Sequence, residues 1–154
     1  MDATSFFALV AVCAPLVHPQ TAKALVSVES AFNAHAIGVV AGALQRQPTT
    51  DREAVATATY LQANGWNFSV GLAQINVHNL ERLGLTIKSA FDPCENLKAM
   101  QALLGECFRR AGNGMAPQRD LRRALSCYYS GNYATGFREG YVRRVVSAAR
   151  APPD

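Results

Sequence analysis

Glu29 is the residue whose position in this chain best suits acid–base chemistry. The pattern of residues 21–32 predicts a helix in which Glu29 lies on an apolar stripe formed by residues of the preceding turns: Ala22, Leu25 and Val26. A carboxylate on such a stripe is costly to ionise, and the negative end of the helix dipole also disfavours the anion. Both effects are expected to raise the pKa of Glu29, as a general acid near neutral pH requires.

A structural explanation of Glu29 is also available. A glutamate at the edge of an apolar stripe can reach water or pair with an arginine. Most helical glutamates are not catalytic, so this explanation is the better one when Glu29 is taken alone. The case for chemistry therefore depends on two segments further along the chain.

The first of these segments, residues 71–76, holds a glycine and two amides within six positions. Its backbone could run close to a sugar, and Gln74 and Asn76 could hydrogen-bond to sugar hydroxyls. A strand-to-helix connection capped by Asn76 explains the pattern as well. The second segment places Tyr128 and Tyr129 at the expected end of a helix. Tyrosine rings can stack on sugars, but adjacent residues face different sides of a helix, so one tyrosine should belong to the core.

In this order and spacing, the three segments resemble the lytic transglycosylases of the soluble-lysozyme-like superfamily. Glu29-Ser30 resembles their catalytic Glu-Ser pair, and residues 71–74 resemble their Gly-Leu-Met-Gln motif. Residues 128–131 resemble their Ala-Tyr-Asn-Ala-Gly motif, with Tyr128 as the motif tyrosine. The resemblance is strongest to the periplasmic transglycosylase component of type IV secretion systems and covers residues 13 to about 146. That likeness is carried by Cys13-Ala-Pro, Glu29-Ser-Ala-Phe-Asn, Phe91-Asp-Pro-Cys94 and Leu125-Ser-Cys-Tyr.

Three positions depart from the pattern of the superfamily. Ala34 stands where a proline is frequent, and Gly38 stands where a serine often helps to position the substrate acetamido group. Tyr129 replaces the asparagine of the third motif. The resemblance implies a mostly α, lysozyme-like α+β fold: a helical domain, a small antiparallel β element and a substrate cleft between them.

The resemblance also implies a reaction and its residues. Glu29 is expected to be the catalytic acid and then base, and Ser30, Gln74, Asn76 and Tyr128 are expected to bind substrate. The bond cleaved would be the β-1,4 bond between N-acetylmuramic acid and N-acetylglucosamine in peptidoglycan, with formation of a 1,6-anhydromuramoyl product. No metal or organic cofactor is expected.

Most glycosidases use two carboxylates. The only acidic residues between Glu29 and Gly71 are Asp51 and Glu53, which suit the start of a helix and so have a structural explanation. Two alternatives to the transglycosylase remain. One is a hydrolytic lysozyme of the same fold that uses Asp51 or Glu53 to orient water. The other is a non-catalytic module that binds glycan during assembly of a secretion machine.

Hydrophobic periodicity and capping residues predict a single domain over residues 1–150 and a disordered tail at 151–154. Short strands are expected at 37–40 and 67–70. Helices are expected at 4–16, 21–32, 51–62, 77–83, 93–111, 118–129 and 136–149.

Four cysteines allow three complete pairings. Cys94 and Cys107 fall in one expected helix, roughly 20 Å apart, which excludes a bond between them and leaves two pairings. Physical reasoning does not choose between these two, and four buried thiols in a cytosolic protein would fit the count as well. The family resemblance implies the pairing Cys13–Cys94 with Cys107–Cys127.

The net charge of +4 and the 49% hydrophobic content fit a folded, basic domain. Nine arginines fall within residues 109–150, and a solvated helix face is their simplest explanation. The expected partners are peptidoglycan strands and other secretion-system components. No nucleic-acid module and no transmembrane segment are predicted. Because Asp2 stands where a secretory signal carries positive charge, we expect a periplasmic protein whose signal peptide is absent from this sequence.

Overall fold

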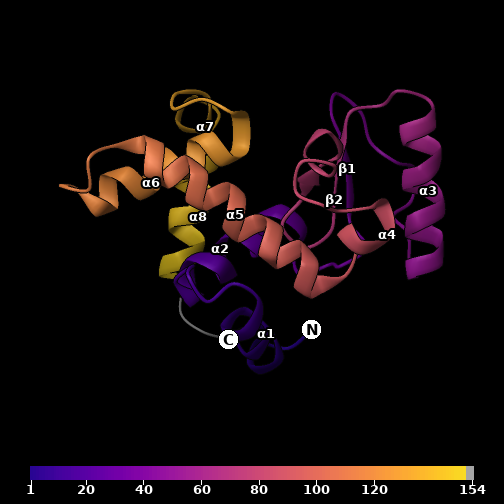
Figure 1. Cartoon of the computed structure of the whole chain (residues 1–154), viewed down its shortest axis with the longest axis horizontal. Coiled ribbons are helices and arrows are strands. Elements are labelled where there is room, and N and C mark those ends of the chain that lie inside the picture. The colour runs from indigo at the N-terminus through magenta and orange to yellow at the C-terminus, as the bar shows by residue number, and fades with distance from the viewer. Residues whose placement is uncertain (152–154) are drawn as a thin grey trace.

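The structure has two parts, which we call the helical body (residues 3–30 and 93–150) and the mixed part (residues 37–90) (Figure 1). The structure is a computed structural model that describes residues 1–151, so the tail expected at 151–154 lies, apart from Ala151, outside the described residues. The helices are α1 (Ala3–Cys13), α2 (Pro19–Ser30), α3 (Asp51–Ala63), α4 (Ile87–Ala90), α5 (Pro93–Ala111), α6 (Pro117–Ser130), α7 (Thr135–Arg138) and α8 (Tyr141–Arg150). The strands are β1 (Ile37–Val39), β2 (Phe68–Val70) and β3 (Ile75–Asn76), and a 3₁₀ turn, η1, spans Val77–Asn79.

Most of the predicted helices are present, and their ends follow from their caps. Thr50 caps α3 and Asp92 caps α5, each accepting a hydrogen bond from a backbone N–H in the first turn. The start predicted at residue 21 for the second helix is two residues late. Helix α2 begins at Pro19, and the ring of His18 accepts from the N–H of Gln20.

Two other predicted helices differ from the structure. Asn76 caps only the 3₁₀ turn η1, rather than a helix that continues to residue 83. The helix predicted over 136–149 is divided into α7 and α8, because Gly140 adopts a left-handed conformation with φ of 79°. This break sets the direction of α8 and of Tyr141 at its start. The sequence analysis also missed α4, which a capping box of Thr86 and Ser89 begins.

The strands form one antiparallel sheet in the order β1-β2-β3, which confirms the small β element. Ile37 pairs with Val70, and Ser69 pairs with Asn76. Phe68 and Val70 are buried while Ser69 between them is half-buried, as expected for a strand with one face on the core. Ser69 and Asn76 therefore share the other face of the sheet, and both line a cleft together with Glu29 and Tyr128 of the helical body.

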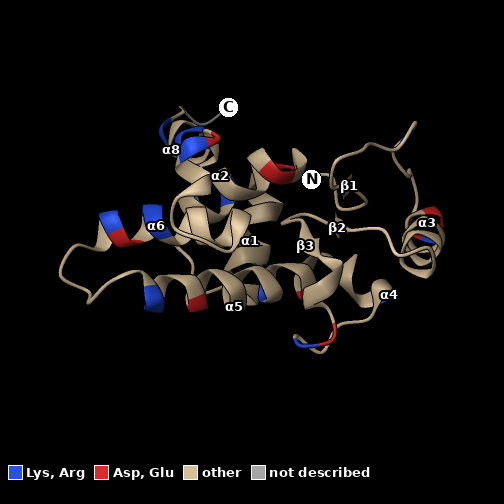
Figure 2. Ribbon diagram, turned by 90° about the horizontal axis from the view of Figure 1, so that it is seen from above, with Lys and Arg blue, Asp and Glu red and all other residues tan. Residues whose placement is uncertain are grey.

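Basic residues gather on the helical body, on α5, α6 and α8 (Figure 2). Every helix within residues 1–151 is too short or too polar to cross a bilayer.

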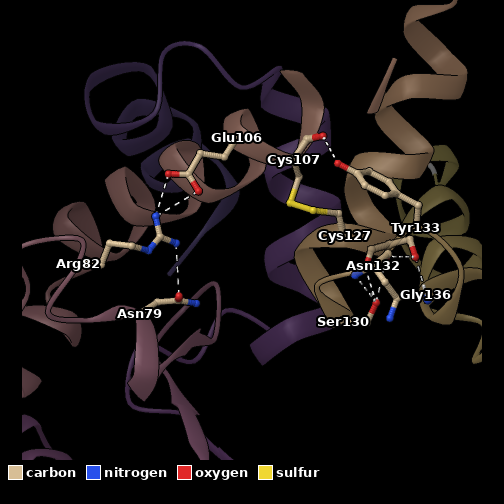
Figure 3. Close-up of a disulfide and its surroundings, with 10 residues drawn as sticks. Asn79, Arg82, Glu106, Cys107, Cys127, Ser130, Asn132, Tyr133 and Gly136 are labelled. Carbon is tan, nitrogen blue, oxygen red and sulfur yellow. Dashed lines mark hydrogen bonds and ion pairs between the residues drawn. A yellow bond between two sulfur atoms is a disulfide. The ribbon is translucent and has the colours of Figure 1, made fainter. Parts of the chain in front are cut away.

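Two disulfides fasten neighbouring helices of the helical body. Cys13 at the end of α1 is bonded to Cys94 at the start of α5, with the two Cα atoms 5.3 Å apart. Cys107 of α5 is bonded to Cys127 of α6, and Tyr133 donates a hydrogen bond to the carbonyl oxygen of Cys107 (Figure 3). This is the pairing that the family resemblance implied. Each bond closes a long chain segment and so lowers the entropy of the unfolded chain.

Asn96 joins the mixed part to the helical body through a fully buried carboxamide. Its Nδ2 donates to the carbonyl oxygens of Val70, at 3.0 Å, and Ala90, at 2.8 Å. Its Oδ1 accepts from the N–H of Ala73 at 2.8 Å. Gly71 lies so close that a Cβ at this position would be 2.2 Å from Nδ2. One side chain of α5 therefore holds β2, the loop 71–74 and the end of α4.

We expect the substitution Asn96→Ala to lower the free energy of unfolding by about 2–4 kcal/mol, because it leaves buried backbone groups without partners. Thermal and urea unfolding measure the loss. Asn113→Ala, an exposed change in the loop between α5 and α6, is the matched control and should change stability by less than about 0.5 kcal/mol. Equal effects of the two substitutions would contradict the role given to Asn96.

Candidate active site

A cleft with a volume of about 260 Å³ separates the sheet from the helical body. The sheet side contributes small and polar residues, and the helical side contributes Glu29 and two tyrosines. The residues that line the cleft are Glu29, Gly38, Val39, Val40, Ser69, Gln74, Asn76, Asn79, Leu103, Tyr128 and Tyr129. Glu29 is the single carboxylate among them, so acid–base chemistry within this cleft depends on that residue.

Glu29 lies in the last turn of α2, mostly buried, with one hydrogen bond to another side chain. The hydroxyl of Tyr141 donates to Glu29 Oε1 at 2.7 Å. Within the described residues Oε2 has no hydrogen-bond partner, so it is the oxygen available to hold and transfer a proton. Burial raises the pKa of Glu29 from 4.5 to about 7, against the opposing effects of the Tyr141 hydrogen bond and the Arg144 charge.

Tyr141 contacts the candidate catalytic group, and no pattern in the sequence predicts this contact. It lies 112 residues from Glu29 in the chain and begins α8 directly after the left-handed Gly140. Its ring is 1% exposed and is stacked on the ring of Tyr129, with centroids 4.5 Å apart. Burial, with a further effect from Glu29, raises the pKa of Tyr141 well above 10, so its hydroxyl remains a donor. No local sequence signal marks this residue, because a tyrosine at a helix start is ordinary.

Tyr128 and Tyr129 point to different sides of α6, as expected for adjacent residues of a helix. The hydroxyl of Tyr128 donates to the carbonyl oxygen of Ala73 at 2.7 Å and so holds the loop 71–74 against α6. Tyr129 is more exposed, and its hydroxyl donates to Glu139 Oε2 at 2.6 Å. Tyr129 therefore covers Tyr141 from the cleft side, while Tyr128 fixes the loop that carries Gln74.

Ser30 and Gln74 also hold this loop. Ser30 Oγ donates to the carbonyl oxygen of Leu72 at 2.7 Å, and Ser30 is not among the residues that line the cleft. Gln74 Nε2 donates to the carbonyl oxygens of Ala36, at 3.1 Å, and Gly71, at 3.0 Å. Both amide hydrogens of Gln74 are thus used within the protein, which leaves Oε1 as the free acceptor in the cleft.

Gly38 accounts for the position of Gln74 Oε1. A Cβ built on Gly38 would lie 2.6 Å from this oxygen, closer than atoms of the two residues can approach. The absence of a side chain at Gly38 therefore leaves room for the Gln74 amide. Asn76 adds a second amide on the same side, since its Nδ2 donates to Asn67 Oδ1 at 2.8 Å and its side chain lines the cleft.

Asp51 and Glu53 lie outside the cleft. Asp51 is exposed and contacts Nε2 of His35 at 2.7 Å. Glu53 forms an ion pair with Arg46, and hydrogen bonds led by the backbone N–H of Thr49 lower its pKa. Both residues belong to the start of α3, where negative charge suits the helix dipole. Within residues 1–151, no group of three or more His, Cys, Asp or Glu is arranged to hold a metal ion.

The chain is similar to proteins of one known family. The profile of the family described as Transglycosylase SLT domain matches residues 8–148. The chain is 50% identical over 151 residues to the type IV secretion system protein virB1 of Brucella abortus biovar 1 (strain 9-941), covering 94% of this chain and 63% of the relative. It is 37% identical over 145 residues to the protein virB1 of Agrobacterium fabrum (strain C58 / ATCC 33970), covering 92% of this chain and 58% of the relative. No solved structure matches the chain.

The helical body, the three-stranded antiparallel sheet and the carboxylate between them define a lysozyme-like α+β domain. The family match covers more than nine-tenths of the chain. The chain belongs to the SLT transglycosylase domain family. It spans about 63% of the length of the virB1 proteins of Brucella that it matches.

Burial of Glu29 gives the protein a pH-dependent stability. The pKa of Glu29 is about 7 in the folded state and 4.5 in the unfolded chain, so the folded state favours the neutral carboxyl group. The free energy of unfolding therefore decreases as pH rises from 4.5 through 7. We expect Glu29→Gln to stabilise the protein by up to about 3 kcal/mol at pH 8 and to have little effect at pH 4. Urea unfolding at the two pH values measures the difference. A gain of the same size at both would contradict the raised pKa.

Tyr141 is expected to oppose the effect of burial on Glu29. The substitution Tyr141→Phe keeps the ring but removes the hydrogen bond to the anion, so the pKa of Glu29 should rise above 7. Carbon-13 NMR titration of the Glu29 carboxyl group measures the change. Tyr133→Phe, which removes a tyrosine hydroxyl that binds the backbone of α5, is the control and should leave this pKa in place.

Proposed function

We propose that this domain is a peptidoglycan lytic transglycosylase in which Glu29 is both the general acid and the general base. The observation that carries the proposal is that Glu29, mostly buried and with a pKa of about 7, is the single carboxylate that lines the cleft. A second carboxylate, which a hydrolase would use to activate water or to form a covalent intermediate, is absent from the lining residues. Membership of the SLT transglycosylase domain family supports the same reaction.

In the first step, Glu29 Oε2 donates its proton to the glycosidic oxygen between N-acetylmuramic acid and N-acetylglucosamine. The C1–O bond breaks, the leaving sugar takes the proton, and positive charge develops at C1 of the muramic acid. The hydrogen bond from Tyr141 to Oε1 remains in both protonation states and stabilises the carboxylate formed in this step. The substrate acetamido group stabilises the cation at C1.

In the second step, the Glu29 carboxylate takes the proton of the muramic acid C6 hydroxyl. The C6 oxygen then bonds to C1 and closes the 1,6-anhydro ring, which returns Glu29 to its neutral form. No water or cofactor enters the balance. Gln74 Oε1 and the amide of Asn76 are the polar groups on the sheet side that would bind the sugar beside the cleaved bond.

The proposed cellular role is supported by the names of the relatives and not by the geometry of the cleft. Relatives named type IV secretion system protein virB1 support a role in secretion, in which local cleavage opens the cell wall for an envelope-spanning complex. Two disulfides fit an oxidising compartment such as the periplasm, where the wall is located.

Product analysis tests the reaction directly. Purified protein should release glycans that end in 1,6-anhydromuramic acid from peptidoglycan sacculi, and mass spectrometry identifies these ends by their mass. Glu29→Gln should lower the rate by at least about 100-fold, because it removes the only acid and base of the cleft. Activity should also decline above pH 7, since the ionised carboxylate cannot donate a proton.

Two controls separate this proposal from the alternatives. Asp51→Asn and Glu53→Gln should keep most of the wild-type rate, because both side chains lie outside the cleft. Loss of activity in either variant, together with reducing-end products, would identify a hydrolase. Binding of glycan without any cleavage by the wild-type protein would identify a non-catalytic module.

A further inference from the structure

A groove on the helical body has no role in the proposed reaction. It consists of two adjoining hollows of about 370 and 360 Å³ on either side of the first half of α6. The α1–α2 connection and α5 bound the first hollow, and α8 bounds the second. Both hollows share His18, Thr21, Gln118 and Leu121, so they form one continuous surface, which we name the α6 groove.

The α6 groove is lined by apolar side chains that solvent can reach. Phe108 of α5 is 39% exposed, and Leu16 of the α1–α2 connection is 86% exposed. Leu121 and Val146 line the groove and are half-buried. Large apolar side chains on one concave surface are typical of a site where another protein binds.

The charged residues that line the α6 groove are all arginines, apart from the titratable His18. Arg109, Arg122 and Arg150 line it from α5, α6 and α8, and no Asp or Glu is among its lining residues. Within the described residues, Arg109 and Arg122 take part in no ion pair, whereas Arg46, Arg82 and Arg119 do. Figure 2 shows blue segments on each of the three helices α5, α6 and α8. An occupant therefore needs carboxylates beside its apolar side chains.

The groove is fixed in shape before anything binds. The N–H of Leu16 donates to Gln101 Oε1 at 2.8 Å, which fastens the α1–α2 connection to α5. The two disulfides join α1 to α5 and α5 to α6. A preformed site loses little conformational entropy on binding, which favours affinity.

We propose that the α6 groove binds an acidic amphipathic helix of a partner protein. The two hollows flank the same stretch of α6, from Pro117 to Leu125, so a helix that fills both hollows crosses α6. Apolar residues of that helix fill the two hollows and flanking Glu or Asp residues pair with the arginines. A glycan strand offers hydroxyls in place of aliphatic side chains, and a bilayer surface does not enter a concave groove.

The α6 groove and the cleft lie at opposite ends of α2. His18 borders the groove, and Glu29 is eleven residues further along the helix, about 16 Å away. A partner held in the groove therefore leaves the cleft open, and the proposal does not depend on the reaction assigned to Glu29. Such a partner would localise the domain while the cleft remains accessible to a long polymer.

Selection from a displayed peptide library tests the proposal. The library contains helical 14-residue peptides with varied apolar residues at i, i+4 and i+7 and with Glu, Lys or Ser at the flanking positions. The wild-type protein should enrich peptides that carry Glu at the flanks. Fluorescence anisotropy with an enriched peptide should give a Kd at least about tenfold weaker for Phe108→Ala and for the double variant Arg109→Glu, Arg122→Glu.

The matched control is Arg143→Glu, an exposed charge reversal on α8 outside the groove, which should change the Kd by less than about twofold. Thermal unfolding verifies that each variant is folded. Enrichment of Lys at the flanks, no enrichment, or equal loss in the control would overturn the proposal. Sedimentation also measures whether the groove variants bind phosphatidylglycerol vesicles or self-associate. The proposal is overturned if the variants lose either of these properties while their affinity for the peptide stays unchanged.

Discussion

The buried carboxamide of Asn96 is the interaction on which the two parts of this domain depend. It satisfies backbone groups of β2, of the loop 71–74 and of α4 from a single position on α5. A buried polar group is stable only when its hydrogen bonds are complete, so the three segments can take few other positions. The same loop is held by Ser30 and Tyr128, which donate to the carbonyl oxygens of Leu72 and Ala73.

Several of the residues that resemble family motifs form hydrogen bonds within the protein. Ser30 and Tyr128 are expected to bind substrate, and in the structure their hydroxyls bind the loop that carries Gln74, while Tyr128 also lines the cleft. The amide hydrogens of Gln74 are used in the same way, so its Oε1 is fixed in the cleft above Gly38. These hydrogen bonds hold the loop so that Gln74 Oε1 and the carboxyl group of Glu29 lie in the same cleft.

The pKa of Glu29 results from two opposing influences, of which burial is the larger. Burial against the helical body disfavours the anion, while the Tyr141 hydroxyl and Arg144 stabilise it. A pKa of about 7 suits the role of acid and then base that we propose for Glu29. Tyr129 stacks on Tyr141 and is itself held by Glu139, so the break at Gly140 helps to set the surroundings of the carboxyl group.

The sequence alone determined the helical class of the fold, the starts of α3 and α5 and the position of Glu29 on an apolar stripe, because periodicity and capping are local properties. Resemblance supplied the disulfide pairing, which helix geometry had only narrowed to two. Tertiary structure decided the rest. Tyr141 contacts Glu29 across 112 residues, and the hydrogen bonds of Asn96 reach back as far as Val70, so neither contact has a local signal. The division of α7 from α8 and the exclusion of Asp51 and Glu53 from the cleft likewise depend on how distant segments pack.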